Sequence, residues 1–221
     1  MAEGTQVRVL VVDDHEVLAD ALTQVLDAEP DLTVVGAAHD LAQARSMLAA
    51  SEVDVVLLDN RLPDGEGVAT MPELRAIRPE AAFVVLTAMT TDSVLIAAIE
   101  NGAAGFVSKT HGVGEVTAAV RAASRGESVI SPELLIRLLP RMGHNPSGSP
   151  AIELTARETE LLGHLGDGLS NAAIAEQMGV SVHTVRNHLA NLSAKLDAHS
   201  RLEVLSIALR AGMLPGHSAA P

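Results

Sequence analysis

The first half of the chain carries polar residues just after short apolar segments. They are Asp13 and Asp14 after 9–12, Asp59 after 53–58, Thr87 after 82–86, and Lys109 after 104–107. If these segments are parallel strands, their carboxyl ends meet at one edge of a sheet, where open α/β sheets bind ligands. The sequence therefore predicts that three carboxylates, a hydroxyl and an ammonium gather in one place.

Such a set of side chains has a specific chemistry. Three close carboxylates repel one another unless a hard cation neutralises them, and Mg²⁺ prefers oxygen ligands while keeping several waters. One carboxylate can then attack a phosphoryl group and form an acyl phosphate. The ammonium of Lys109 and the hydroxyl of Thr87 are suited to hold the phosphoryl oxygens.

The elements that must position these residues follow from the apolar pattern. Five short apolar runs alternate with helical stripes, the first of which is formed by Val17, Leu18, Ala21, Leu22, Val25 and Leu26. Runs that are apolar throughout are typical of strands buried on both faces. The pattern predicts an α/β fold with a doubly wound, five-stranded parallel sheet in the flavodoxin-like order 2-1-3-4-5.

The segment 140–150 separates two regions, because three Pro, two Gly and two Ser in eleven residues disfavour helix and strand. We predict a phosphoacceptor domain at 1–128, a connecting helix and linker at 129–150, a second domain at 151–213 and a disordered tail at 214–221.

The second domain is predicted to be a smaller, all-α, four-helix domain. Thr155 and Glu158 form a capping-box pattern, and Ser170, Ser181 and Ser200 are expected to cap three further helices. The third of these helices carries an apolar stripe that should face inward, at Val182, Val185, Leu189, Leu192 and Leu196. Two helices joined around Gly179 predict a helix-turn-helix.

Composition excludes several classes of protein. The chain has no Cys, which rules out disulfides and thiolate metal sites, and its nine His match no zinc-ligand spacing. It has no apolar run of 18 residues and no signal-peptide pattern, so we expect a cytoplasmic protein without a membrane partner.

The motifs of the first domain resemble the receiver domain of two-component response regulators over residues 7 to about 126. They are 11–15 (VVDDH), 57–59 (LLD), 86–88 (LTA) and 105–109 (GFVSK). The resemblance implies that a sensor histidine kinase phosphorylates Asp59 with Mg²⁺ as cofactor. It also implies that Asp14 binds the metal directly, Asp13 through water, and Arg61 through its backbone carbonyl. Thr87 and Phe106 would form the conformational switch.

The second domain is similar to the LuxR-type helix-turn-helix over about 152–213, on motifs such as 154–158 (LTARE) and 184–188 (TVRNH). Together the two resemblances indicate the NarL/FixJ class. Arg186 and Asn187 on the outer face of the third helix, beside His183, suit base contacts in the major groove of double-stranded DNA. Thr184, Asn191 and Lys195 suit phosphate contacts. The alternative is that this face is simply solvated.

The helix-turn-helix region is weakly charged for a DNA-binding domain, with a net charge of −2 over 151–221. Few phosphate contacts imply modest affinity per monomer, and a homodimer on DNA would compensate. Val204, Ala208 and Ala211 form a stripe that could mediate it, unless that stripe belongs to the core.

Three functions compete at this stage. We favour a phosphorylation-switched transcription factor that is not an enzyme apart from its own phosphotransfer and slow dephosphorylation. A regulator that binds DNA without phosphorylation is the second, and the complete acidic set argues against it. An Mg²⁺-dependent hydrolase with a nucleophilic Asp is the third, although such enzymes usually carry Asp-x-Asp at the first strand and a large cap.

Overall fold

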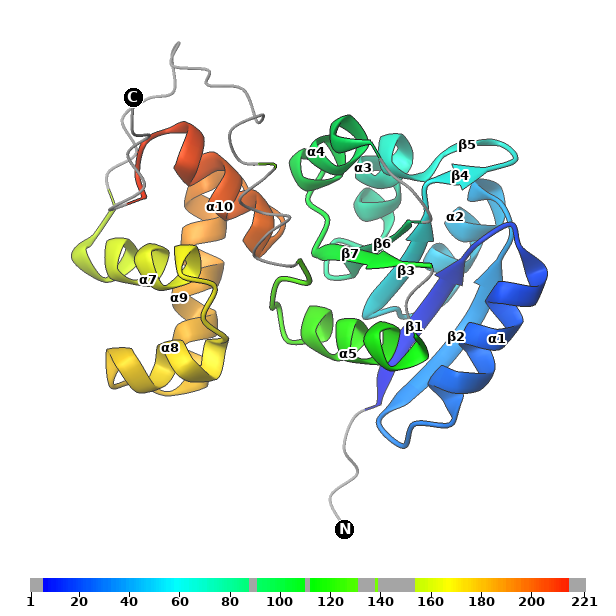
Figure 1. Ribbon diagram of the computed structural model, residues 1–221, viewed down its shortest axis with the longest axis horizontal. Helices are drawn as coiled ribbons and strands as arrows, with labels where there is room; N and C mark the ends of the chain where they lie inside the picture. Colours follow the sequence, from blue (N-terminus) through cyan, green and yellow to red (C-terminus); the bar gives the residue numbers. More distant parts are fainter. Residues whose placement is uncertain (1–5, 88–90, 110–111, 131–137, 139–153, 215–221) are drawn as a thin grey trace. The chain divides into compact units, whose positions relative to one another are not determined.

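The computed structural model describes residues 6–87, 91–109, 112–130, 138 and 154–214. The chain forms two compact units, Met1–Val129 and Ile130–Pro221, which are shown in Figure 1. Most of the predicted connecting helix and linker at 129–150, and all but the first residue of the predicted tail at 214–221, lie outside the described residues. The predicted domain limits therefore stay predictions.

The first unit is built on a five-stranded parallel sheet. Its strands, in chain order, are β1 (Val7–Val12), β2 (Leu32–Ala38), β3 (Val55–Asp59), β6 (Ala82–Thr87) and β7 (Gly105–Ser108). They lie in the order β2-β1-β3-β6-β7, and every neighbouring pair is parallel. The predicted doubly wound sheet and its strand order are confirmed.

Helices cover both faces of the sheet (Figure 1). They are α1 (Glu16–Asp27), α2 (Leu41–Ala50), α3 (Gly67–Ile77), α4 (Asp92–Glu100) and α5 (Val113–Ser124). Helices α1 and α5 pack into one apolar cluster with β1, β3 and β6, whereas α3 contacts α2 and α4. The sheet is thus enclosed on both sides, which explains its uniformly apolar strands.

The predicted stripe on α1 was partly wrong. Val17 is 85% exposed and Ala21 is also exposed, whereas Ala19, Leu22 and Leu26 are the buried residues. Their spacing of three and four residues defines a narrower face than the sequence suggested. Val17 lies in the first turn of the helix, on the side that faces solvent.

A short hairpin that the sequence did not predict follows the third strand. It consists of β4 (Arg61–Leu62) and β5 (Gly65–Glu66), paired antiparallel. The chain then returns so closely that a Cβ at Gly67 would lie 2.2 Å from the backbone oxygen of Asp59. The amide of Gly67 donates to the Asn60 backbone oxygen at 2.8 Å. This tight return fixes the backbone just beyond Asp59.

The second unit contains α7 (Ala156–Gly166), α8 (Asn171–Met178), α9 (Val182–Leu196) and α10 (Arg201–Arg210). All four predicted caps are confirmed: the Thr155–Glu158 capping box is present, and Ser170, Ser181 and Ser200 accept backbone amides with their side chains. Gly179 ends α8 with φ 64°, a left-handed conformation that glycine adopts at little cost. A helix-turn-helix is the result.

Two expectations about apolar faces need correction here. Val182 is 37% exposed, because it stands in the first turn of α9, while Val185, Leu189, Leu192 and Leu196 are buried as predicted. Val204 and Ala208 belong to the core of the helical unit and only Ala211 of that stripe is exposed, so most of the stripe considered for dimerisation is core. Among the described residues, no helix is long and apolar enough to cross a membrane.

Candidate acidic site and nucleic-acid interface

The carboxyl ends of the strands bring Asp13, Asp59 and Lys109 into contact. Asp13 follows β1 and is fully buried, and Asp59 ends β3 with 7% exposure. The Lys109 ammonium lies 2.6 Å from Asp13 Oδ2 and 2.8 Å from Asp59 Oδ2. Its backbone amide donates to the Thr87 backbone oxygen at 2.7 Å, which anchors it beside the end of β6. Three strand ends therefore supply one ion-paired centre.

The protonation of Lys109 depends on its two carboxylate partners, Asp13 and Asp59. Burial disfavours the Lys109 ammonium, but its hydrogen bonds to Asp13 and Asp59 outweigh that cost and raise the pKa of Lys109 above its ordinary value. The lysine is thus cationic at neutral pH. One ammonium cannot neutralise Asp13, Asp14 and Asp59 together, so with all three ionised the centre keeps excess negative charge that favours a further cation.

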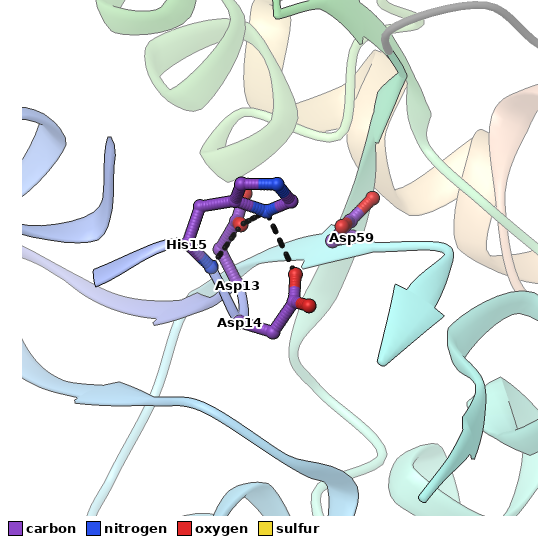
Figure 2. Close-up of side chains that lie close together, drawn as sticks. All are labelled: Asp13, Asp14, His15 and Asp59. Atoms are coloured by element: carbon purple, nitrogen blue, oxygen red, sulfur yellow. Dashed lines mark hydrogen bonds and ion pairs between the residues drawn. The ribbon is translucent and has the colours of Figure 1, made fainter. Parts of the chain in front are cut away.

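Asp14 and His15 complete the cluster. The His15 Nδ1 lies 3.1 Å from Asp13 Oδ1 and 2.8 Å from Asp14 Oδ1, as the dashed lines in Figure 2 mark. One possible ligand atom from each of Asp13, Asp14, His15 and Asp59 lies within 4.8 Å of the others. Sequence reasoning missed His15 as a member of this cluster. The available signal was its position directly after the acidic pair, which places a ring nitrogen within reach of both carboxylates.

These residues fit a magnesium ion. The centre offers carboxylate oxygens at one open edge of the sheet, and the Asp14 side chain is 34% exposed, so water can complete the coordination. Asp13 and Asp14 come from one strand and Asp59 from the next, which the register of β1 on β3 holds side by side.

The outer face of α9 carries most of the residues predicted to contact DNA. His183, Arg186, Asn187 and Asn191 are exposed, whereas Thr184 is half-buried. The Asn187 side-chain nitrogen lies 3.3 Å from His183 Nε2, so these two residues support each other one turn apart. The Thr184 hydroxyl lies 2.8 Å from that of Ser181, the N-cap of α9. The exposed face is polar and continuous over the first half of the helix.

Comparisons with known proteins agree with both halves of this geometry. A family model for the response regulator receiver domain matches residues 9–121, and one for bacterial regulatory proteins of the luxR family matches 153–208. The chain belongs to the response regulators of the NarL/FixJ class. This class consists of transcription regulators.

Several response regulators are similar over nearly the whole chain. The DNA-binding transcriptional activator DevR/DosR of Mycobacterium tuberculosis is 36% identical, with 95% of this chain and 98% of the relative covered. The nitrate/nitrite regulator NarP of Escherichia coli is 33% identical, over 91% and 94%. The solved structure of RcsB from Salmonella enterica serovar Typhimurium, bound to a promoter, matches with a TM-score of 0.56 and 21% identity, over 93% and 99%. That last likeness concerns the fold.

Three further residues with predicted receiver roles lie in the strands of this response regulator. Thr87 ends β6, half-buried, and pairs in register with Ser108 of β7. Phe106 lies in β7 with 9% exposure. Arg61 is exposed in β4, two residues beyond Asp59, and the role of its carbonyl as a metal ligand stays a prediction.

Lys195 has a role within the response regulator that the sequence did not reveal. Its ammonium lies 2.7 Å from Glu158 Oε2, and the Glu158 side chain also accepts the Thr155 amide at 2.8 Å in the capping box. The Lys195 hydrogen bond, followed by the Thr155 backbone amide, lowers the pKa of Glu158. One carboxylate thus joins the start of α7 to the end of α9.

Proposed function

We propose that Asp59 accepts a phosphoryl group from a sensor histidine kinase in an Mg²⁺-dependent reaction. Phosphorylation then switches homodimerisation and sequence-specific DNA binding by the helical unit. The observation that carries this proposal is the contact of one ammonium, Lys109, with the carboxylates of Asp13 and Asp59 at 2.6 and 2.8 Å. A centre with more carboxylates than ammonium groups is suited to bind a divalent cation and, beside it, a phosphoryl group.

In the proposed reaction an Asp59 carboxylate oxygen attacks the phosphorus of a phosphohistidine. A P–O bond forms as the P–N bond breaks, and the imidazole leaves. Asp13, Asp14, Asp59 and the Arg61 carbonyl would hold Mg²⁺, which neutralises charge on the phosphoryl oxygens when bound. The Lys109 ammonium turns from Asp59 to a phosphoryl oxygen. The Thr87 hydroxyl donates to another, and Phe106 follows inward as the switch.

Phosphorylation of Asp59 can be tested directly with a small phosphodonor. Wild-type protein incubated with acetyl phosphate and Mg²⁺ should gain one phosphoryl group in intact mass spectrometry. Asp59→Asn should gain none, because an amide is not a nucleophile toward phosphorus under these conditions. Labelling of Asp59→Asn at the wild-type rate, or labelling of the wild type without a divalent cation, would contradict the proposal.

We propose that α9 binds the major groove of double-stranded DNA. Arg186 would donate two hydrogen bonds to a guanine, Asn187 would contact an adenine, and His183 lies beside them on the exposed face. Thr184, Asn191 and Lys195 would contact phosphates. The promoter complex of RcsB, formed with the phosphomimetic BeF₃⁻, supports both the DNA and the phosphorylation steps for a protein of this fold.

A duplex selected from a random pool by the phosphorylated protein provides the DNA probe. Acetyl phosphate with Mg²⁺ should increase the affinity of the wild type for this duplex and its dimer fraction in sedimentation. Asp59→Asn should show neither change. Equal affinity of unphosphorylated wild type would favour the alternative regulator that binds DNA without phosphorylation.

The strand that carries Phe106 also holds the chain where it leaves the first unit. The Phe106 amide donates to the Val129 backbone oxygen at 2.7 Å. The Val129 amide in turn donates to the Ala104 backbone oxygen at 3.0 Å. Gly105 pairs with Val129, and a Cβ at Gly105 would lie 2.1 Å from the Val129 oxygen. We propose that displacement of Phe106 on phosphorylation reaches the segment after Val129 through this pairing.

Gly105→Ala inserts a methyl group into that pairing. We expect Val129 to separate from β7, because a contact near 2 Å between a carbon and a backbone oxygen cannot be accommodated. Hydrogen exchange at the Phe106 and Val129 amides should accelerate, and acetyl phosphate should no longer raise DNA affinity. Gly114→Ala, where a Cβ meets nothing within 4 Å, is the matched control. Unchanged phosphorylation-dependent binding in Gly105→Ala would exclude this route.

A further inference from the structure

The His15 imidazole contacts the oxygens that a cation at the acidic centre would use. Its Nδ1 lies 2.8 Å from Asp14 Oδ1 and 3.1 Å from Asp13 Oδ1, and its backbone amide donates to the same Asp13 oxygen at 3.0 Å. Figure 2 shows the ring beside both carboxylates, with Asp59 from the neighbouring strand nearby. The ring is 69% exposed, so it can move without disturbing the core. His15 therefore adds a nitrogen donor to an oxygen site.

The chemistry of that nitrogen distinguishes between cations. Mg²⁺ strongly prefers oxygen, whereas imidazole suits Co²⁺, Ni²⁺, Cu²⁺ and Zn²⁺, and affinity for nitrogen and oxygen sites rises along that series up to Cu²⁺. Zn²⁺ binds His nitrogen and carboxylate oxygen at about 2.0–2.2 Å, so the ligand atoms of a tetrahedral site lie about 3.4 Å from one another. The His15 Nδ1 lies 2.8 and 3.1 Å from the two aspartate oxygens, and one atom from each of the four residues lies within 4.8 Å of the others. Shifts of about 1 Å would bring the four atoms to the tetrahedral spacing.

We propose that the acidic centre binds a late first-row divalent cation, Zn²⁺ in particular, with His15 as a direct ligand beside Asp13, Asp14 and Asp59. Nδ1 releases its proton to solvent when it binds the cation. Four protein ligands complete the tetrahedral coordination usual for Zn²⁺, so no position is left on the cation for a phosphoryl oxygen. Zn²⁺ is therefore an inhibitor of phosphorylation, and His15 determines the selectivity of the centre.

For Mg²⁺ the same contact has the opposite consequence. The His15 ring must leave Asp13 Oδ1 and Asp14 Oδ1 before a hard cation can use them, because Mg²⁺ does not recruit the nitrogen. Loss of the ring should therefore leave Mg²⁺ binding intact or strengthen it, while it weakens Zn²⁺ binding. A residue that merely supports the fold would change the affinity for both cations in the same direction. Weaker Zn²⁺ binding with unchanged or stronger Mg²⁺ binding therefore identifies His15 as a ligand.

The experiment is calorimetric titration of the full chain with Zn²⁺ and, separately, with Mg²⁺. His15→Ala should lower Zn²⁺ affinity by roughly tenfold or more, since even residues behind the ligands contribute 10–100-fold to metal affinity. Its Mg²⁺ affinity should not fall. His15→Asn keeps a hydrogen-bond donor for the carboxylates and should behave like His15→Ala. His199→Ala, an exposed His of the helical unit, is the control for Zn²⁺ bound elsewhere.

The inference rests on the proposed cation site but fails separately from it. Mg²⁺ binding by the wild type, with equal Zn²⁺ affinity in wild type and His15→Ala, would overturn the role of His15 and leave the proposed function intact. Zn²⁺ binding that depends on His15 supports the inference, even if acetyl phosphate labelling of Asp59 were to fail. Zn²⁺ should also slow that labelling in the wild type more than in His15→Ala, and equal slowing in both would count against it.

Discussion

The acidic centre and the outer face of α9 differ in how their residues are held in place. At the centre, Asp13, Asp59 and Lys109 are largely buried, and each fixes the position of the others at 2.6 and 2.8 Å. On α9, Arg186 and Asn191 are exposed and the contact between His183 and Asn187 is a single 3.3 Å approach. Charges at the centre interact at low effective dielectric, whereas those on α9 are screened by solvent.

This difference predicts which property a substitution will change in each region. Residues of the centre depend on one another for stability as well as for chemistry, because an unpaired buried charge is costly. Residues on the α9 face contribute little to the folded state, and they become important only when a partner covers them. Substitutions at the centre should therefore lower the free energy of unfolding more than substitutions on the α9 face. For DNA affinity we expect the α9 substitutions to have the larger direct effect.

Lys109→Met should have the largest effect on stability. Met keeps much of the volume but removes the charge between Asp13 and Asp59, and breaking a buried ion pair costs about 3–5 kcal/mol. The free energy of unfolding, from urea titration followed by far-UV circular dichroism, should fall by that amount without Mg²⁺. Added Mg²⁺ should restore part of it, because the cation replaces the missing positive charge.

The pH dependence follows from the direction of the Lys109 shift. Because its pKa is raised in the folded state, its contribution is fully present below about 10.5, the ordinary value, and is lost as pH rises through the folded pKa. The difference between wild type and Lys109→Met should thus be constant near neutral pH and shrink in alkali. A variant as stable as the wild type at pH 7 would show that the ion pair is not a structural element.

Arg186→Ala should have a small effect on stability and a large effect on DNA affinity. Its effect on unfolding should stay within about 0.5 kcal/mol, as is usual for surface positions. Its affinity for the selected duplex should fall by about 1–3 kcal/mol, which is the usual value of a bidentate contact to guanine. Arg157→Ala, which removes an exposed Arg from α7, is the matched control. Equal losses in the two variants would mean that α9 contributes only charge and no base contact.

The sequence predicted that Asp13, Asp59 and Lys109 come together, because the end of a strand is visible as the end of an apolar run. Once Asp13, Asp59 and Lys109 were placed at such ends, the parallel sheet brought them together. His15 escaped prediction since its contacts depend on the rotamer of an exposed ring. The β4–β5 hairpin escaped because two-residue strands leave no apolar pattern.

On the helices, prediction succeeded at the caps and weakened in the first turns. Ser181 and Ser200 are recognised by side-chain chemistry that acts within three residues. Val17 and Val182 were placed on buried faces by periodicity, yet both are exposed, because the first turn of a helix extends past the surface that the helix covers. Periodicity gives the direction of a side chain but does not locate the end of the core.

Lys195→Met should give the smallest change in the free energy of unfolding. It tests whether one residue of α9 can contribute both to the fold and to DNA binding. This substitution removes the ammonium that pairs with Glu158 and that we propose also contacts a DNA phosphate. The pair is about one-third exposed on the lysine side, so its loss should cost less than about 1 kcal/mol. If Lys195 also contacts a phosphate, the slope of log affinity against log salt should fall by about 0.9.

Glu158→Gln is the comparator that separates the two roles of Lys195. Gln can still close the capping box, but it carries no charge for the ammonium. The lowered pKa of Glu158 stabilises the fold above about pH 4.5 and loses that effect as pH falls, so both variants should flatten the acid limb of the stability curve. Only Lys195→Met should reduce the salt slope. If neither variant changes it, Lys195 serves only to join α7 to α9, and DNA binding depends on the exposed residues alone.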